Sequence, residues 1–173
     1  GTERLRVDPA GCLCINGTVF SAGGATLTSQ NNFFVDSGHT SLTTTGCNNI
    51  SIGYQAGCCL TSGSHNFFAG IQSGNSNTTG GCNTFIGSQA GVCNTAGRFN
   101  FFVGCGAGYK NTTGCHNTFF GNGAGWSNVS GNYNAFIGNL AGYCNTTGCY
   151  NFFAGYCAGS NNTTGCNNFF AGC

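Results

Sequence analysis

The sequence predicts an all-β fold, a β-solenoid of the parallel β-roll type with about eight to nine coils of 17 residues each. Three observations predict it. An Asn followed four residues later by Gly recurs every 17 residues from Asn49 to Asn168, without an insertion. Gly and Asn hold fixed places in each repeat, and the apolar residues form short runs between them. Helical repeats would need apolar spacing near 3.6 residues and would avoid several Gly per repeat.

The repeat divides the chain into two parts. Residues 1–31 form an N-terminal lead-in β segment, and residues 32–173 form the solenoid, with the consensus N-x-F-[IVAF]-G-x-x-A-G-x-x-N-T-T-G. Fixed Gly residues supply the positive φ angles that the corners of a coil require. Each coil adds about 4.8 Å of rise, so the stack extends for roughly 40 Å.

The strand of each coil lies directly after its first Asn, which we number position one. Positions two and four exchange volume between coils: Phe67 is paired with Ala69, and Thr84 with Ile86. Because alternate strand residues share a face and a packed interior needs constant volume, we expect positions two and four to face inward. The alternative is that position three faces inward and positions two and four face outward.

Position three is then expected to face solvent, and it is Phe in every coil but one, where it is Ser51. Soluble monomers rarely leave such an apolar column in water. We therefore predict lateral self-association through this column, which consists of Phe34, Phe68, Phe85, Phe102, Phe119, Phe136, Phe153 and Phe170.

The composition excludes several functional classes. Charged residues make up 4% of the chain, against about 25% in ordinary soluble domains, and the net charge is +1. No basic surface for nucleic acid is expected. With three Asp and Glu and three His, acid–base pairs are scarce, so the chain is not expected to be an enzyme. The Cys12–Cys14 and Cys58–Cys59 spacings lack nearby His partners, and we expect no metal or cofactor.

No run of 18 apolar residues occurs, so no membrane span is predicted. The 14 Cys favour an oxidising, extracellular setting. Equivalent positions in adjacent coils lie about 4.8 Å apart, which suits a disulfide. This spacing predicts the pair Cys149–Cys166. Cys58 with Cys93 and Cys144 with Cys157 are further candidates, and the alternative is buried, reduced thiols.

Asn-x-Ser/Thr sequons recur with the repeat. If the chain is made in a eukaryotic secretory pathway, a line of glycans could follow one exposed corner. The alternative is that NTTG is a favourable turn and produces sequons by chance. The candidate acceptors are Asn16, Asn49, Asn77, Asn111, Asn128, Asn145 and Asn162, and Asn161 also begins a sequon.

Two stretches resemble a known family. "NTFIGSQAG" (83–91) and "NAFIGNLAG" (134–142) are similar to the head repeats of trimeric autotransporter adhesins, and to repeats in phage and algal-virus fibre proteins. The opening "GTERLRVDPAGCLCINGT" (1–18) resembles the lead-in of tail-fibre-like proteins. The resemblance implies a left-handed β-roll and a lateral trimer. The 17-residue period, the Phe at position three and the Cys content depart from the family pattern.

These features predict a structural subunit of an extracellular or virion-surface fibre. It would self-associate through the Phe column and through open solenoid ends, since the last coil stops at Cys173 without a polar cap. An adhesin that binds a glycan or a cell-surface receptor is the first alternative. Its candidate sugar-stacking residues are Tyr54, Tyr109, Trp126, Tyr143 and Tyr156. An ice-binding solenoid, suggested by the recurring Thr pairs, is the second alternative.

Overall fold

The fold is taken from a computed structural model, which describes residues 5–7, 13–15, 18–19, 25–27, 31–35 and 44–173. The side chains are described for 31–35 and 44–173. The predicted glycan acceptor Asn16 and the Cys12 part of the lead-in lie outside the described residues.

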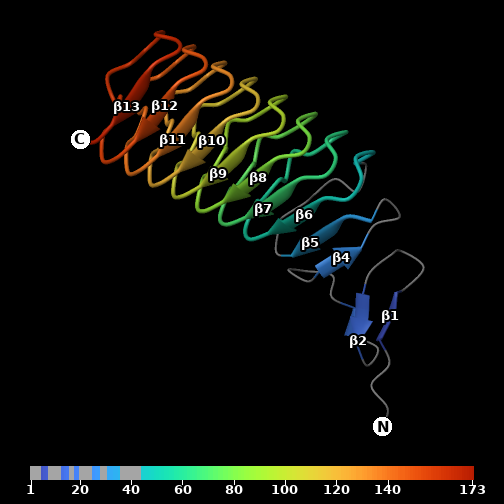
Figure 1. The fold of residues 1–173 in the computed structure, drawn as a ribbon. Coiled ribbons are helices and arrows are strands. Elements are labelled where there is room, and N and C mark those ends of the chain that lie inside the picture. Colours follow the sequence, from blue (N-terminus) through green and yellow to red (C-terminus); the bar gives the residue numbers. More distant parts are fainter. Residues whose placement is uncertain (1–4, 8–12, 16–17, 20–24, 28–30, 36–43) are drawn as a thin grey trace.

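The described residues contain thirteen short strands in two sheets and no helix (Figure 1). The first sheet is antiparallel and contains β1, β2 and β3. The second has ten strands in the order β4 to β13, and β5 to β13 run parallel. The bounds are β1 Leu5–Val7, β2 Leu13–Ile15, β3 Thr18–Val19, β4 Ala25–Leu27, β5 Phe33–Val35, β6 Ile50–Ile52, β7 Phe67–Ala69, β8 Thr84–Ile86, β9 Phe101–Val103, β10 Thr118–Phe120, β11 Ala135–Ile137, β12 Phe152–Ala154 and β13 Phe169–Ala171.

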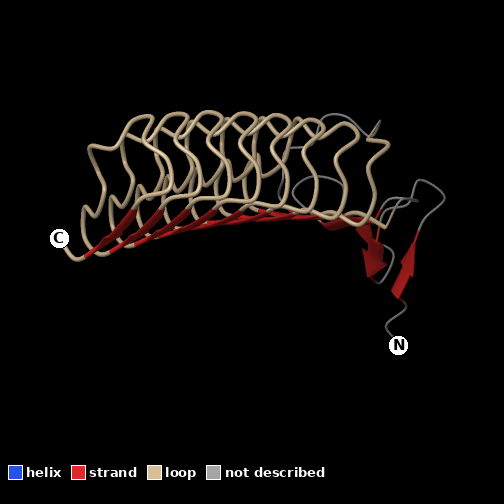
Figure 2. Cartoon of the chain, turned by 45° about the horizontal axis from the view of Figure 1, so that its top comes forward, coloured by secondary structure: helices blue, strands red, loops and turns tan. Residues whose placement is uncertain are grey.

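The parallel strands are in strict register with the repeat. Phe102 lies between Phe85 and Phe119, its equivalents in the neighbouring coils. All the parallel strands lie along one side of the coils, and turns make up the other sides (Figure 2). The predicted β-solenoid of 17-residue coils is therefore confirmed. With no helix in the described ranges, there is none that is long and apolar enough to cross a membrane.

The lead-in and the solenoid meet within one sheet. β4 belongs to the 1–31 segment by sequence, yet it pairs antiparallel with β5, with Thr26 opposite Phe34. The N-terminal edge of the parallel sheet is thus covered by a strand of opposite direction.

The interior of the solenoid is the position-three column, which we call the inner Phe column. Phe68, Phe102 and Phe136 are fully buried, and their rings stack on neighbouring Phe rings at centroid distances of 4.7 to 5.3 Å. The expectation that this column faces outward is wrong, and the alternative orientation is the one the structure adopts. Of the predicted interface residues, Phe34, Phe68, Phe85, Phe102, Phe119, Phe136 and Phe153 are buried inside their own chain, and Phe170 in the last coil is 44% exposed.

The inner Phe column depends on small residues on the opposite wall of each coil. Position eight is mostly Ala, as in Ala90 and Ala107, and these side chains join the Phe rings in one core cluster. Position nine is Gly: a Cβ on Gly74 would lie 2.7 Å from the Phe68 ring, and the φ angle there is +58°. Gly at position nine therefore makes room for the ring and supplies the left-handed turn.

Two columns of buried Asn side chains hold the corners of the coils. At position one, the Asn100 carboxamide oxygen accepts the backbone N–H of Asn117 at 3.0 Å, and the Asn100 amide donates to the Gly114 carbonyl at 2.8 Å. At position twelve, Asn111 donates to the Asn94 side chain at 2.8 Å and to Gly114 at 3.1 Å. Each Asn thus links its own coil to its neighbour, and burial makes these hydrogen bonds costly to leave unmade.

Replacing one inner ring tests the orientation of the strand. We expect Phe102→Ala to lower the free energy of unfolding by about 3–5 kcal/mol, because a fully buried ring leaves a cavity. The matched control is its strand neighbour Phe101→Ala, whose side chain is 43% exposed and which should cost below about 1 kcal/mol. Urea denaturation at dilute protein measures both. Equal losses would contradict the inward orientation.

Removing one buried Asn tests the second column. Asn128 donates to Asn111 and Gly131 and accepts from Asn145, at 2.8 to 3.1 Å. Asn128→Ala removes three buried hydrogen bonds and leaves the Asn111 side-chain oxygen without this donor, whereas the Gly131 carbonyl and the Asn145 amide each keep a second bond. A loss of about 2–3 kcal/mol is expected in the same denaturation assay. The control Asn139→Ala, at an exposed position, should be nearly neutral. A neutral Asn128→Ala would show that the column adds little stability.

Candidate interaction face

The outward side chains of the parallel sheet form a continuous apolar surface, which we call the outer sheet face. It consists of two columns, because positions two and four of each strand point away from the core while position three points into it. The second-position column is Phe33, Ile50, Phe67, Thr84, Phe101, Thr118, Ala135, Phe152 and Phe169. The fourth-position column is Val35, Ile52, Ala69, Ile86, Val103, Phe120, Ile137, Ala154 and Ala171.

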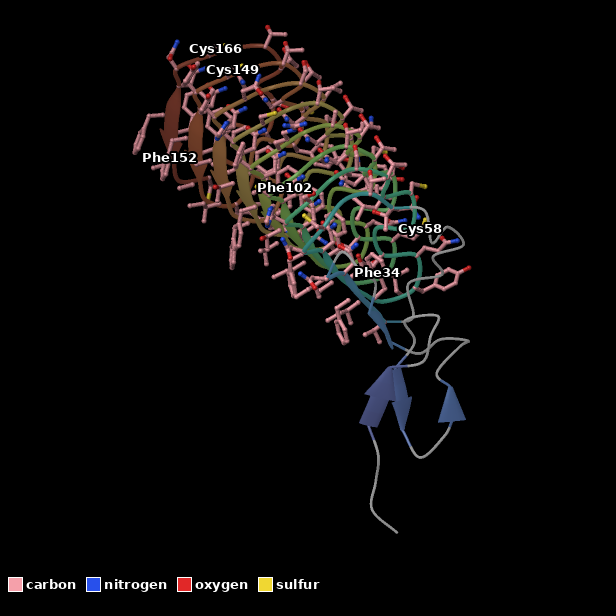
Figure 3. The ribbon with its side chains drawn as sticks, turned by 90° about the vertical axis from the view of Figure 1, so that its right-hand side faces the viewer. Phe34, Cys58, Phe102, Cys149, Phe152 and Cys166 are labelled. Carbon is pink, nitrogen blue, oxygen red and sulfur yellow. The ribbon has the colours of Figure 1, made fainter. Side chains whose placement is uncertain are left out.

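Large apolar side chains on this face lie substantially in solvent. Phe101 is 43% exposed, Phe120 53% and Ile137 42%. No charged residue occurs in either column, and Thr84 and Thr118 are its polar members. Figure 3 labels Phe152, which projects from this face, and Phe102 and Phe34, which belong to the inner Phe column. Contiguous apolar patches of this kind mark interaction surfaces in soluble proteins.

The volume exchange noticed in the sequence belongs to this face and not to the core. Phe67 lies beside Ala69, Thr118 beside Phe120, and Ala135 precedes Ile137 on its strand. On these strands a large side chain is paired with a smaller one, so none of them places two large side chains next to each other on the face. Any closely packed layer requires such an exchange, so the exchange alone does not distinguish an interior face from an outer one.

The predicted disulfide pairs have different outcomes in the structure. Cys149 and Cys166 occupy equivalent places on neighbouring coils, and the Cys149 backbone N–H donates to the Cys166 sulfur at 3.1 Å (Figure 3). Cys144 and Cys157 line one shallow groove of about 320 Å³ with Tyr143. All four are free thiols in the structure. Their pairing stays a prediction.

The third pair, Cys58 with Cys93, is wrong. Cys58 lies in the coil that begins at Asn49 and Cys93 in the coil that begins at Asn83, so the whole coil 66–82 separates them. Two coil rises of about 4.8 Å exceed the Cα separation that a disulfide tolerates. The nearest thiol to Cys58 is instead its chain neighbour Cys59, with the two sulfur atoms 3.8 Å apart.

Some of these thiols are poor nucleophiles at neutral pH. Burial, aided by the hydrogen bond and charge of Cys59, raises the pKa of Cys58 to about 11. Burial also raises the pKa of Cys93, although the nearby Lys110 charge opposes the shift. Protonated thiols neither attack disulfides nor bind metals readily. Within the described ranges, no three His, Cys, Asp or Glu side chains gather into a metal-binding group.

Most of the predicted glycan acceptors are core residues. Asn49, belonging to the first Asn column, is fully buried, and the members of the second column at Asn77, Asn111, Asn128 and Asn145 are also 0% exposed. Their amide nitrogens, to which a glycan would attach, donate buried hydrogen bonds. A glycan on these five residues is therefore incompatible with the folded coil. Asn162 is half-buried and donates to Asn145 at 2.7 Å, whereas its neighbour Asn161 is exposed.

The Thr columns are also structural. The Thr78, Thr95 and Thr112 hydroxyls each donate to the main-chain carbonyl of the next coil, at 3.1 to 3.2 Å. The second member of each Thr pair forms a separate column that Ala96 and Ser130 interrupt. The surface therefore lacks two continuous columns of unoccupied hydroxyls.

Two aromatic columns run along the other sides of the coils. Tyr109, Trp126 and Tyr143 stack with ring centroids 4.2 and 6.1 Å apart. A second column, at position seventeen, was missed in the sequence, although four successive repeats carry a ring there: Phe99, His116, Tyr133 and Tyr150, with centroids 4.8 to 5.0 Å apart. In both columns the ring faces cover one another. A sugar that stacks on an aromatic face would reach only the ends of the columns.

Tyr54 and Tyr156, the remaining candidates for sugar stacking, are 56% and 61% exposed. They lie six repeats apart along the stack, so they do not form one site.

Comparison of the chain with protein-family profiles, with curated proteins and with solved structures found no match.

The buried Asn residues predict which sequons can carry a glycan. When the chain is secreted from a eukaryotic host and purified as folded protein, we expect Asn161 to carry a glycan and Asn128 to carry none. The reason is that Asn161 is exposed, whereas Asn128 is buried. Peptide mapping by mass spectrometry, with and without enzymatic deglycosylation, measures both sites. Full occupancy of Asn128 in folded protein would contradict the buried column.

Proposed function

We propose that this chain is a structural subunit of an extracellular or virion-surface fibre. The observation that carries the proposal is the uninterrupted stack. The inner Phe column and both Asn columns pass from coil to coil without an insertion, and neighbouring strands stay in register throughout. Such a stack is rigid along its length, and its interior side chains hold neighbouring coils together.

The surface chemistry supports the same role. Within 44–173 the charged side chains are Arg98 and Lys110, and the parallel sheet presents an apolar face along its whole length. A surface of this kind suits association with other protein subunits. The aligned Cys149 and Cys166 fit a fibre in an oxidising compartment, where a disulfide between coils would staple the stack.

The two alternatives have less support. A glycan-binding adhesin would use exposed aromatic faces, and the aromatic columns cover theirs by stacking. An ice-binding surface would use arrays of free hydroxyls, and the Thr112 and Thr146 hydroxyls are already donated to main-chain carbonyls. Neither alternative has an observation of its own that favours it.

Antibody labelling tests the fibre directly. Gold-conjugated antibodies raised against the purified chain are applied to intact cells or virions that carry its gene, and the preparation is viewed by negative-stain electron microscopy. We expect gold along external filaments. Antibodies depleted on the purified chain serve as the control. Labelling confined to the cell interior, or to dispersed material without filaments, would overturn the proposal.

A further inference from the structure

We propose that two copies of the chain pair face to face through their outer sheet faces, with the two solenoids parallel. The two-fold axis runs along the stack, above the inner Phe column, and relates position two of each strand to position four of the same strand in the partner. The pairing deepens the proposed fibre function, on which its biological role rests, by naming the lateral contact.

The area of the face suffices for a stable dimer. Its eight largest exposed side chains are between 37% and 71% exposed: Ile50, Ile52, Ile86, Phe101, Phe120, Ile137, Phe152 and Phe169. If a whole large side chain offers about 150–200 Å², these eight expose roughly 550–700 Å² per copy. Two copies would bury about 1,100–1,400 Å², before the smaller residues are counted. Specific interfaces begin at about 1,000 Å² in total.

A second copy matches the face in its spacing. The side chains of each column repeat once per strand, at the separation of hydrogen-bonded strands, about 4.8 Å. Another sheet of the same coils has the same spacing, so side chains meet in register along the full length. The absence of charge from both columns also suits self-pairing, because no like charges are brought together.

The volume exchange supplies the complementarity. Within a strand, positions two and four are about 6.6 Å apart, and the proposed axis passes between them. It places Phe67 opposite the partner's Ala69, and Thr118 opposite the partner's Phe120. The reciprocal contact is identical, because a two-fold interface uses the same patch twice. On each such strand a large side chain meets a smaller one.

An antiparallel pairing matches less well. In an antiparallel dimer the two-fold axis would lie along the middle strand β9. Position two of one copy would then face position two of the other, so Phe101 would meet the partner's Phe101. On the adjacent strands, Thr84 would meet the partner's Thr118 while Ile86 would meet the partner's Phe120. A gap would then lie beside a bulge. On these three strands the parallel arrangement avoids both, because each larger side chain meets the smaller one of the same strand in the partner.

Sedimentation equilibrium in reducing buffer tests the dimer, because disulfides cannot contribute there. The wild-type chain at about 100 µM should sediment at twice its mass of 17.6 kDa. Ala69→Phe places two rings against each other across the axis and should raise the dissociation constant at least about tenfold. Circular dichroism of each variant checks that the solenoid is intact.

A volume swap tests the geometry. The double variant Phe67→Ala with Ala69→Phe restores a large side chain opposite a small one in the parallel dimer, so it should recover wild-type affinity. In the antiparallel dimer the same swap would set Phe at residue 69 against the partner's Ile137 and Ala at residue 67 against the partner's Ala135, without rescue. Tyr150→Lys, on an exposed residue of another side, is the matched control and should leave the dimer unchanged.

Each result is decisive for the pairing. A monomer at about 100 µM, a trimer, or a swap that fails to rescue would overturn the parallel dimer. Dimer formation by the wild type, its loss in Ala69→Phe and its recovery in the swap support it. The assay uses purified chain and is independent of where the protein is found, so its failure is distinguishable from failure of the antibody labelling.

Discussion

The direct stacking of each coil on the next is the constraint on which the whole structure depends. Parallel strands pair with their equivalents 17 residues away, so identical positions become neighbours at the separation of hydrogen-bonded strands. The Phe102 and Phe119 rings therefore stack at 4.7 Å because their strands are paired, and not because the rings select that distance. The Asn columns follow from the same stacking, since each carboxamide reaches the next coil.

Stacking also allows backbone conformations that an isolated turn would avoid. Tyr133 and Tyr150 adopt left-handed φ angles of 56° and 58°, which cost a non-Gly residue about 1–2 kcal/mol. Both rings lie in the aromatic column, and their backbone N–H groups donate to the preceding coil. Repetition offsets the strain, because every coil that adopts the turn gains the same contacts with two neighbours.

The sequence was sufficient for the architecture, because the 17-residue period and its fixed Gly are consequences of coiling alone. The sequence did not show in the same way which side chains of each strand point into the core. In a three-residue strand the side-chain direction alternates only once, so the pattern does not show which residues face the core. Pairing a large with a small residue at positions two and four suits a packed core and a level outer surface equally. The better signal was variation: position three is Phe almost everywhere because a buried column must fill the same interior space in each coil, whereas the residues at positions two and four change from coil to coil. The second Asn column also looks like a row of glycan acceptors in the sequence, because a glycosylation sequon and a buried Asn-Thr-Thr-Gly corner have the same residues.

Because all coils have the same spacing, the spacing alone does not fix how two outer sheet faces align along the stack. The order of large and small side chains can fix this alignment. Two faces with one repeat distance could slide past each other by a whole coil without losing strand register. In the aligned parallel arrangement Phe67 meets the partner's Ala69, but a slip of one coil sets Phe67 against the partner's Ile86, while Ala69 meets the partner's Thr84. A bulge and a gap then lie side by side, and packing is lost at both. In a face without charge, the sequence of large and small residues along the stack is what distinguishes one alignment from the next.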